Sequence, residues 1–239
     1  MLGSVNSVES LGTVDGPGIR AVIFLNGCSL RCKYCHNPET WIMQEKNYEA
    51  SSLVEKVIRY KPYFNHGGGV TFSGGEPLLQ PEFLIECSRL FKENGINVAL
   101  DTAGAGIGHY EEILKYTDLI IFDVKDVTKE RFFDLTGGNI ENTWQFLDIA
   151  RKMNSKFWIR QVIIPGVNDT FAYMEKLDKY IKDHINIDNV ERVEFLPYHK
   201  LGTEKYEKLH IFNPYQEKEA MDATKCKELY DYFISIFKE

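Results

Sequence analysis

The chain has 239 residues, of which 44% are hydrophobic, and a formal net charge of −7 at neutral pH. We expect neither nucleic acid nor a membrane as a partner, because lysine and arginine form no cluster and no apolar run approaches the roughly 20 residues that cross a bilayer. The first residues lack a secretion signal and three of the five cysteines are grouped, which favours a reducing, cytoplasmic location over a disulfide framework.

Short β-branched runs alternate with helical patterns along the chain. We predict strands at 19–26, 69–73, 97–101, 119–123, 156–164 and 192–197. We predict helices at 52–60, 81–94, 110–116, 128–135, 142–153, 171–184 and 217–237. This alternation indicates an α/β fold with parallel strands and right-handed crossovers.

Polar residues follow the predicted strands at their carboxyl ends, which converge on one mouth in a barrel of parallel strands. Six strands are fewer than the eight of a complete barrel, so we expect an open, partial (β/α)6 TIM-like barrel. We expect a single domain over residues 1–239. Its parts are an N-terminal extension over 1–17, the barrel over about 18–205 and a C-terminal helix over about 215–237.

The most specific motif is a group of three cysteines, Cys28, Cys32 and Cys35, with the spacing C-x3-C-x2-C. Three thiolates form a soft-metal site and are one fewer than the four that close a 4Fe-4S cluster, so one iron remains free to bind another molecule. This pattern predicts an enzyme rather than an electron carrier. The alternative is a zinc-stabilised binding module without chemistry, whose fourth ligand would be His36 or a distant residue.

A glycine-rich run at 67–77 includes the second predicted strand and the turn that follows it. Gly74 and Gly75 let the backbone approach a ligand closely, and the Glu76 carboxylate is suited to accept hydrogen bonds from an ammonium group. The alternative is a tight turn in which this carboxylate caps the next helix. The sequence leaves both interpretations of Glu76 open.

The cysteine spacing, followed by Gly-Gly-Glu-Pro at 74–77, resembles the radical S-adenosylmethionine superfamily. The resemblance is closest to the glycyl radical enzyme activases within it and runs from about residue 5 to about residue 205. The motifs that carry it lie at 13–20, 34–37, 40–41, 67–76, 101–102, 158–160, 165–166 and 196–199. The chain departs from this family at Ala103, where we expect an asparagine.

The resemblance implies a 4Fe-4S cluster and S-adenosylmethionine as cosubstrate, with an electron supplied by a flavodoxin or a ferredoxin. It implies that a 5′-deoxyadenosyl radical removes a hydrogen atom from a glycine Cα of pyruvate formate-lyase or of another glycyl radical enzyme. The cofactors would carry this chemistry, and the protein would position it. A small-molecule substrate is the alternative within the same chemistry.

The resemblance also implies roles for particular residues. Implied cosubstrate contacts are Tyr34, Cys35, His36, Gly74, Gly75, Glu76, Asp123, Val124, Lys125 and His199. A Na⁺ or K⁺ ion is implied at Asp101, Thr102 and Asp123, where acidic groups beside the cosubstrate carboxylate would otherwise repel one another. Asp15 and Arg160 would bind the glycine-bearing loop of the partner. A structural ion pair is the alternative for Arg160.

Overall fold

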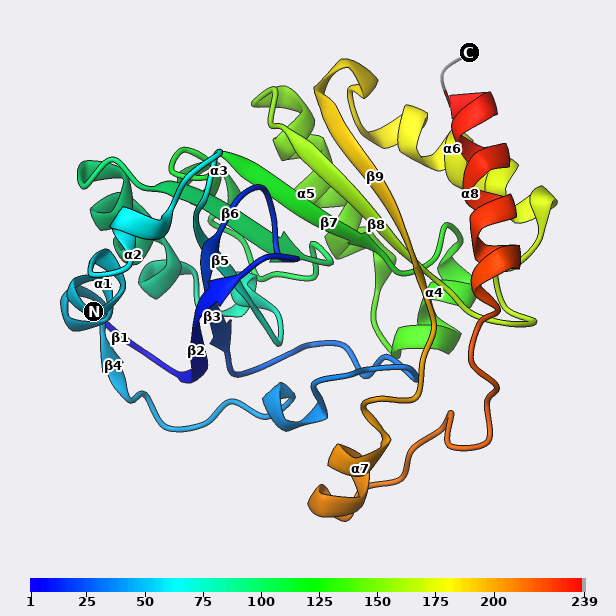
Figure 1. Ribbon diagram of the computed structural model, residues 1–239, viewed down its shortest axis with the longest axis horizontal. Coiled ribbons are helices and arrows are strands. Elements are labelled where there is room, and N and C mark those ends of the chain that lie inside the picture. Colours follow the sequence, from blue (N-terminus) through cyan, green and yellow to red (C-terminus); the bar gives the residue numbers. More distant parts are fainter. Residues whose placement is uncertain (238–239) are drawn as a thin grey trace.

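A curved seven-stranded sheet forms the centre of the computed structural model, which describes residues 1–237 (Figure 1). The strands lie in the order β2 (Val5–Gly12), β3 (Arg20–Leu25), β5 (Gly69–Gly74), β6 (Asn97–Thr102), β7 (Leu119–Val124), β8 (Phe157–Ile163) and β9 (Val190–Pro197). Every neighbouring pair from β3 to β9 is parallel. The six predicted strands and the partial parallel barrel are therefore confirmed.

Strand β2, which was not predicted, lies within the residues expected to form the N-terminal extension. It pairs antiparallel with β3, from Val5 opposite Leu25 to Gly12 opposite Arg20. Only Val5 of its eight residues is fully buried and its apolar residues do not alternate regularly, so its hydrophobic pattern is too weak to predict a strand. Strands β2 and β9 form the two edges of the sheet. A separate antiparallel pair joins β1 (Leu2–Gly3) to β4 (Tyr48–Glu49).

Helices cover the outer face of the sheet, except α7 (Thr203–Leu209), which projects below it (Figure 1). They are α1 (Ala50–Ile58), α2 (Pro81–Glu93), α3 (Tyr110–Leu114), α4 (Lys129–Thr136), α5 (Ile140–Lys152), α6 (Phe171–His184), α7 (Thr203–Leu209) and α8 (Ala223–Phe237). Helix α7 was not predicted, and the C-terminal helix begins at Ala223 instead of residue 217. None of the helices within residues 1–237 has the length and apolar character to span a bilayer.

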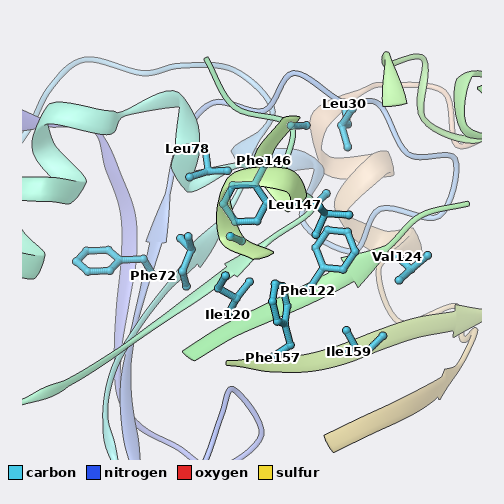
Figure 2. Packing of buried hydrophobic residues seen from close by; sticks show 14 of the residues in the cluster. Leu30, Phe72, Leu78, Ile120, Phe122, Val124, Phe146, Leu147, Phe157 and Ile159 are labelled. Carbon is cyan, nitrogen blue, oxygen red and sulfur yellow. The ribbon is translucent and has the colours of Figure 1, made fainter. Parts of the chain in front are cut away.

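The main core lies between the outer face of the sheet and these helices. Ile120 and Phe122 of β7 pack with Phe146 and Leu147 of α5 (Figure 2). Phe146 is fully buried, so its truncation to alanine would cost about 3–5 kcal/mol. This packing fixes where β7 lies along its own axis relative to α5, and therefore the position of the residues that follow β7.

The inner face of the sheet is apolar at its base. A small separate cluster there consists of Ala99, Leu119, Ile121 and Trp158. Because alternate residues of a strand share a face, Asp123 follows Ile121 on β7 and Arg160 follows Trp158 on β8. Charged side chains therefore collect at the carboxyl ends of the strands, inside the partial barrel.

A buried arginine holds the amino ends of three strands together. Arg20, at the start of β3, is fully buried and donates to the Thr71 hydroxyl at 2.7 Å, the Val70 carbonyl at 2.6 Å and Asn97 Oδ1 at 2.9 Å. Burial lowers the pKa of Arg20 to about 10. Its hydrogen bonds satisfy the guanidinium without a contacting carboxylate and hold β3, β5 and β6 in register.

Candidate functional site

The three grouped cysteines lie on the loop that leaves β3. The backbone N–H groups of Arg31 and Lys33 donate to carbonyl oxygens at the end of α4, at 2.7 and 2.9 Å. Burial raises the pKa of the Cys28 thiol to about 11 and that of Cys32 to about 12. It also raises the pKa of Cys35, while hydrogen bonds from Asn37 and Trp41 act in the opposite direction. The thiols are therefore neutral without metal, and binding of a metal must release their protons.

One cavity of about 210 Å³ joins the cysteine loop to the carboxyl ends of the strands. This is well above the roughly 10–15 Å³ that one water requires, so the cavity admits a larger ligand. The predicted residues that line it are Cys28, Cys32, Tyr34, Cys35, His36, Gly74, Gly75, Glu76, Asp101, Thr102, Asp123, Lys125 and Arg160. Lining residues that we did not predict include Leu30, Asn37, Thr40, Trp41, Ser73, Ala103, Val162 and Leu196.

The donor set fits an iron–sulfur cluster better than a single zinc ion. Within residues 1–237, no three side chains of His, Cys, Asp or Glu converge closely enough to hold one metal ion. The cysteines of a 4Fe-4S cluster each bind a different iron and need not converge on one point. A structural zinc ion, in contrast, requires four ligands around a single centre.

The glycines of the second motif bring the end of β5 against the cysteine loop. A Cβ on Gly75 would lie 2.2 Å from the carbonyl oxygen of Gly27, next to Cys28. Gly74 has a φ of +109°, which favours glycine, and a Cβ there would lie 2.4 Å from the backbone nitrogen of Leu25. Only glycine fits this approach, which exposes the backbone of 74–75 to the cavity.

The Glu76 carboxylate already has protein partners. It is buried and accepts hydrogen bonds from the Thr102 hydroxyl at 2.5 Å and from the backbone N–H groups of Leu78, Ala103 and Ala105 at 3.2, 3.1 and 3.4 Å. Burial raises the pKa of Glu76, and these hydrogen bonds lower it. These contacts match the alternative in which Glu76 caps a turn, here the 3-10 helix Pro77–Leu79.

Two carboxylates and two cations lie beside one another across β6, β7 and β8. Asp123 pairs with Lys125 at 3.0 Å, whereas Asp101 accepts a hydrogen bond from the Ser73 hydroxyl at 2.7 Å. Burial, with the nearby charge of Asp123, raises the pKa of Asp101 to about 7, and Arg160 opposes this rise. Lys125 therefore neutralises only one of the two acids directly, and the motive for a bound cation remains at Asp101.

Arg160 lies at the boundary between the cavity and the edge of the sheet. In register it faces Asp123 on β7 and Glu194 on β9. Its Nε donates to Glu194 Oε2 at 3.0 Å, and its Nη2 donates to the Val14 carbonyl oxygen. The ion pair expected as the alternative is therefore present. Asp15 does not line the cavity; its carbonyl oxygen accepts a hydrogen bond from Thr71 at 2.6 Å.

Two residues of the implied cosubstrate site lie outside the main cavity. The Val124 side chain is buried in the core. His199 lies behind His36, with ring centroids 4.2 Å apart and planes 9° apart. Its carbonyl oxygen lies 3.1 Å from His36 Nε2, and its side chain borders a smaller hollow on the outer side of the cysteine loop.

This geometry agrees with the comparisons to known proteins. The family model described as "Radical SAM superfamily" matches residues 22–188. The chain therefore belongs to the radical SAM superfamily, whose members use a 4Fe-4S cluster and S-adenosylmethionine, and the cavity offers residues that fit both.

Curated relatives narrow the family further. The chain is 51% identical over 240 residues to the "Pyruvate formate-lyase-activating enzyme" of Clostridium pasteurianum, covering 100% of both proteins. It is 44% identical over 243 residues to the protein of the same name from Staphylococcus aureus (strain USA300), covering 96% of this chain and 94% of the relative. At such identity over the whole length, it belongs to the same family as these activating enzymes.

Solved structures share the fold at lower identity. A domain of a pyruvate-formate lyase-activating enzyme from Bacteroides vulgatus ATCC 8482 matches with a TM-score of 0.56 and 22% identity, over 70% of this chain and 94% of that chain. A radical SAM methyltransferase from Sphaerobacter thermophilus matches with a TM-score of 0.65 and 13% identity, over 98% of this chain and 75% of that chain. These similarities support the fold alone.

Proposed function

We propose that this protein activates pyruvate formate-lyase by generating a glycyl radical on it with S-adenosylmethionine. The observation that carries the proposal is the cavity in which three cysteines of one loop meet the carboxyl ends of the parallel strands. Full-length identity of 51% to an activating enzyme of that name supports the choice of client. The zinc-module alternative is disfavoured, since the described residues offer no converging set of ligands.

Cys28, Cys32 and Cys35 hold the cluster in this proposal. When bound, the cluster supplies the electron that cleaves the cosubstrate and yields a 5′-deoxyadenosyl radical. The protein keeps the loop fixed against α4 and surrounds the cavity with buried residues, which limits access of water and oxygen. The electron donor is a flavodoxin or a ferredoxin, as the family resemblance implies, and the location is cytoplasmic.

The cosubstrate is held in the same cavity, between the cysteine loop and the carboxyl ends of the strands. The exposed backbone at Gly74–Gly75 is suited to its ammonium group, and the charges of Asp123 and Lys125 are suited to its ribose hydroxyls and carboxylate. Tyr34 and His36 line the adenosine side. Glu76 contributes by holding the loop at 102–105 and not by direct contact, because its oxygens already accept four hydrogen bonds.

A monovalent cation binds between Asp101, Thr102 and Asp123 in this proposal. Its charge offsets the repulsion between Asp101, Asp123 and the incoming carboxylate. In a preparation first freed of both ions, addition of K⁺ and addition of Na⁺ should give different rates of cosubstrate cleavage. An unchanged rate would remove the cation from the account.

Arg160 and Asp15 position the glycine-bearing loop of the client. The guanidinium borders the cavity and already donates to a backbone carbonyl, that of Val14, which is the kind of contact an extended peptide offers. The Asp15 side chain lies near it, as its pKa indicates: burial raises the pKa of Asp15, and the charge of Arg160 opposes this rise. The backbone carbonyl of Asp15 is engaged by Thr71.

The test mixes anaerobically reconstituted and reduced protein with S-adenosylmethionine and pyruvate formate-lyase. Electron paramagnetic resonance should then detect a glycyl radical signal that requires all three components. A signal obtained only with another glycyl radical enzyme would reassign the client. Absence of cosubstrate cleavage under any condition would refute the radical chemistry itself.

A further inference from the structure

The outer side of the cysteine loop is covered by chain that follows the last strand. We name residues 199–213 the C-terminal strap; it includes α7 (Thr203–Leu209). Figure 1 shows α7 projecting below the sheet, and it contacts the short 3-10 helix Pro38–Thr40 that follows the cysteines. The mechanism proposed above makes no use of this strap.

Three residues of the strap contact the residues around the third cysteine. The Tyr206 hydroxyl donates to the Cys35 carbonyl oxygen at 2.9 Å. Lys205 Nζ donates to Asn37 Oδ1 at 2.8 Å and also pairs with Glu39. The His36 ring stacks on His199. Contacts therefore reach the backbone of Cys35 itself and the residues that follow it.

Of the residues in the strap, Tyr206 is the best positioned to hold the cysteine loop, because it is buried and reaches both ends of that loop, one directly and the other through Trp41. It is the only buried residue of α7, with 3% of its surface exposed. Its ring meets that of Trp41 edge to face, with centroids 5.8 Å apart. Trp41 lines the cavity, and its carbonyl oxygen accepts the N–H of Cys28 at 3.1 Å. The Tyr206 ring thus supports the start of the loop, while its hydroxyl reaches the end.

The close approach of strap and loop requires a small residue. A Cβ on Gly202 would lie 3.1 Å from His36 Cα and 3.4 Å from the Cys35 carbonyl oxygen. The first distance is tighter than ordinary van der Waals contact, so a larger residue there would push the two segments apart. This independent feature indicates that the strap is built to seat against the loop.

We propose that Tyr206 is a positioning residue for the metal cluster, and that its hydrogen bond to the Cys35 carbonyl keeps the third thiol aimed into the cavity. Groups just beyond the ligands fix ligand orientation in metal sites in this way. The strap also shields this side of the loop from solvent and oxygen. The inference rests on the proposed function only in taking Cys35 as a cluster ligand.

The first test uses the metal-free protein. Iodoacetamide alkylates each cysteine at a rate that mass spectrometry can follow, and Tyr206→Phe removes the hydroxyl while it keeps the ring against Trp41. Because a buried hydrogen bond shifts a local opening equilibrium by about fivefold, Cys35 should react about fivefold faster in the variant. The rate at Cys28 should not change. Tyr232→Phe is the control, since its hydroxyl bonds Glu175 at 2.9 Å on a distant surface.

Wild-type rates at Cys35 in folded Tyr206→Phe protein would overturn the inference, and so would an equal rise at Cys28 and Cys35, which indicates general loosening. If Tyr206→Phe does not fold, Lys205→Met removes a second contact of the strap and should also raise the rate at Cys35 selectively. An unchanged rate at Cys35 in that variant would overturn the inference in the same way.

The second test uses the reconstituted protein. The cluster absorbance should decay in air at least about twofold faster in Tyr206→Phe than in wild type or Tyr232→Phe, because the loop opens more often. An unchanged decay would count against the shielding role. Selective alkylation of Cys35 in the variant, with no glycyl radical formed on the client, would support the positioning role of Tyr206 and refute the proposed client. A glycyl radical on the client without selective alkylation would support the client and refute the positioning role.

Discussion

Glu76→Gln separates the two roles that the sequence left open for this carboxylate. Its Oε1 accepts from Thr102 Oγ1 and the N–H of Leu78, and its Oε2 accepts from the N–H groups of Ala103 and Ala105. Each oxygen therefore faces two donors. A glutamine amide keeps one oxygen and places an NH₂ group against the other two donors, whichever way it is turned.

The expected loss follows from these contacts. Hydrogen bonds to a charged group contribute about 1.5–3 kcal/mol each, so the loss of two removes about 3–6 kcal/mol. Burial raises the pKa of Glu76, which means that burying its charge is unfavourable. The substitution removes this charge, and the free energy regained offsets part of the loss. We expect the free energy of unfolding to fall by about 2–4 kcal/mol.

Urea unfolding of the metal-free protein under anaerobic conditions measures this change. Glu86→Gln is the matched control, because that half-buried carboxylate pairs with Arg89 on the surface of α2 and its substitution should change the stability by less than about 0.5 kcal/mol. An unchanged unfolding free energy in Glu76→Gln, together with weaker binding of S-adenosylmethionine, would refute the capping role and restore direct contact with the cosubstrate.

Three further predictions concern the cluster, the client and the C-terminal helix. Cys32→Ala should abolish the brown cluster absorbance and cosubstrate cleavage while far-ultraviolet circular dichroism stays unchanged; retention of absorbance and cleavage would contradict the ligand assignment. Arg160→Ala should abolish glycyl radical formation but preserve cosubstrate cleavage measured without the client. The fold persists in this variant, because Arg192 still pairs with Glu194 at 2.7 Å. Loss of both activities would assign Arg160 to the cosubstrate site. Lys225→Met should lower the unfolding free energy by about 0.5–1 kcal/mol at neutral pH, and thermal melts should show this difference vanish as the pH falls below about 4. The sign follows because burial raises the pKa of Asp169, but the hydrogen bonds from Lys225 and the Gly166 N–H together with the Lys225 charge outweigh burial and lower it, so the stabilisation exists only while Asp169 is ionised; a difference that survives at pH 2 would contradict the pairing.

The sequence predicts the central strands well because each is a short apolar run that is buried on both faces and bounded by glycine or polar residues. It does not predict β2, in which Val5 alone is buried, nor α7, in which Tyr206 alone is buried. Both elements form because of their tertiary partners, β3 for the strand and the cysteine loop for the helix.

The site was predictable where chemistry-bearing residues stand at strand ends or within one motif. The pairings between them were not. Ser73 meets Asp101 only because β5 and β6 align, and Glu194 meets Arg160 only through the register of β8 with β9. Sequence separation hides such neighbours. A signal was present for Glu194 alone: a charged residue between Val193 and Phe195, which point to the other face of the strand.

The central claim is that three thiolates hold the cluster and leave one iron for the cosubstrate. A crystal structure of reconstituted protein, grown without oxygen and with S-adenosylmethionine, tests it most directly. We predict Cys28, Cys32 and Cys35 on three irons and the amino and carboxylate groups of the cosubstrate on the fourth. A fourth protein side chain on the cluster, or a single zinc ion among these cysteines, would contradict the account.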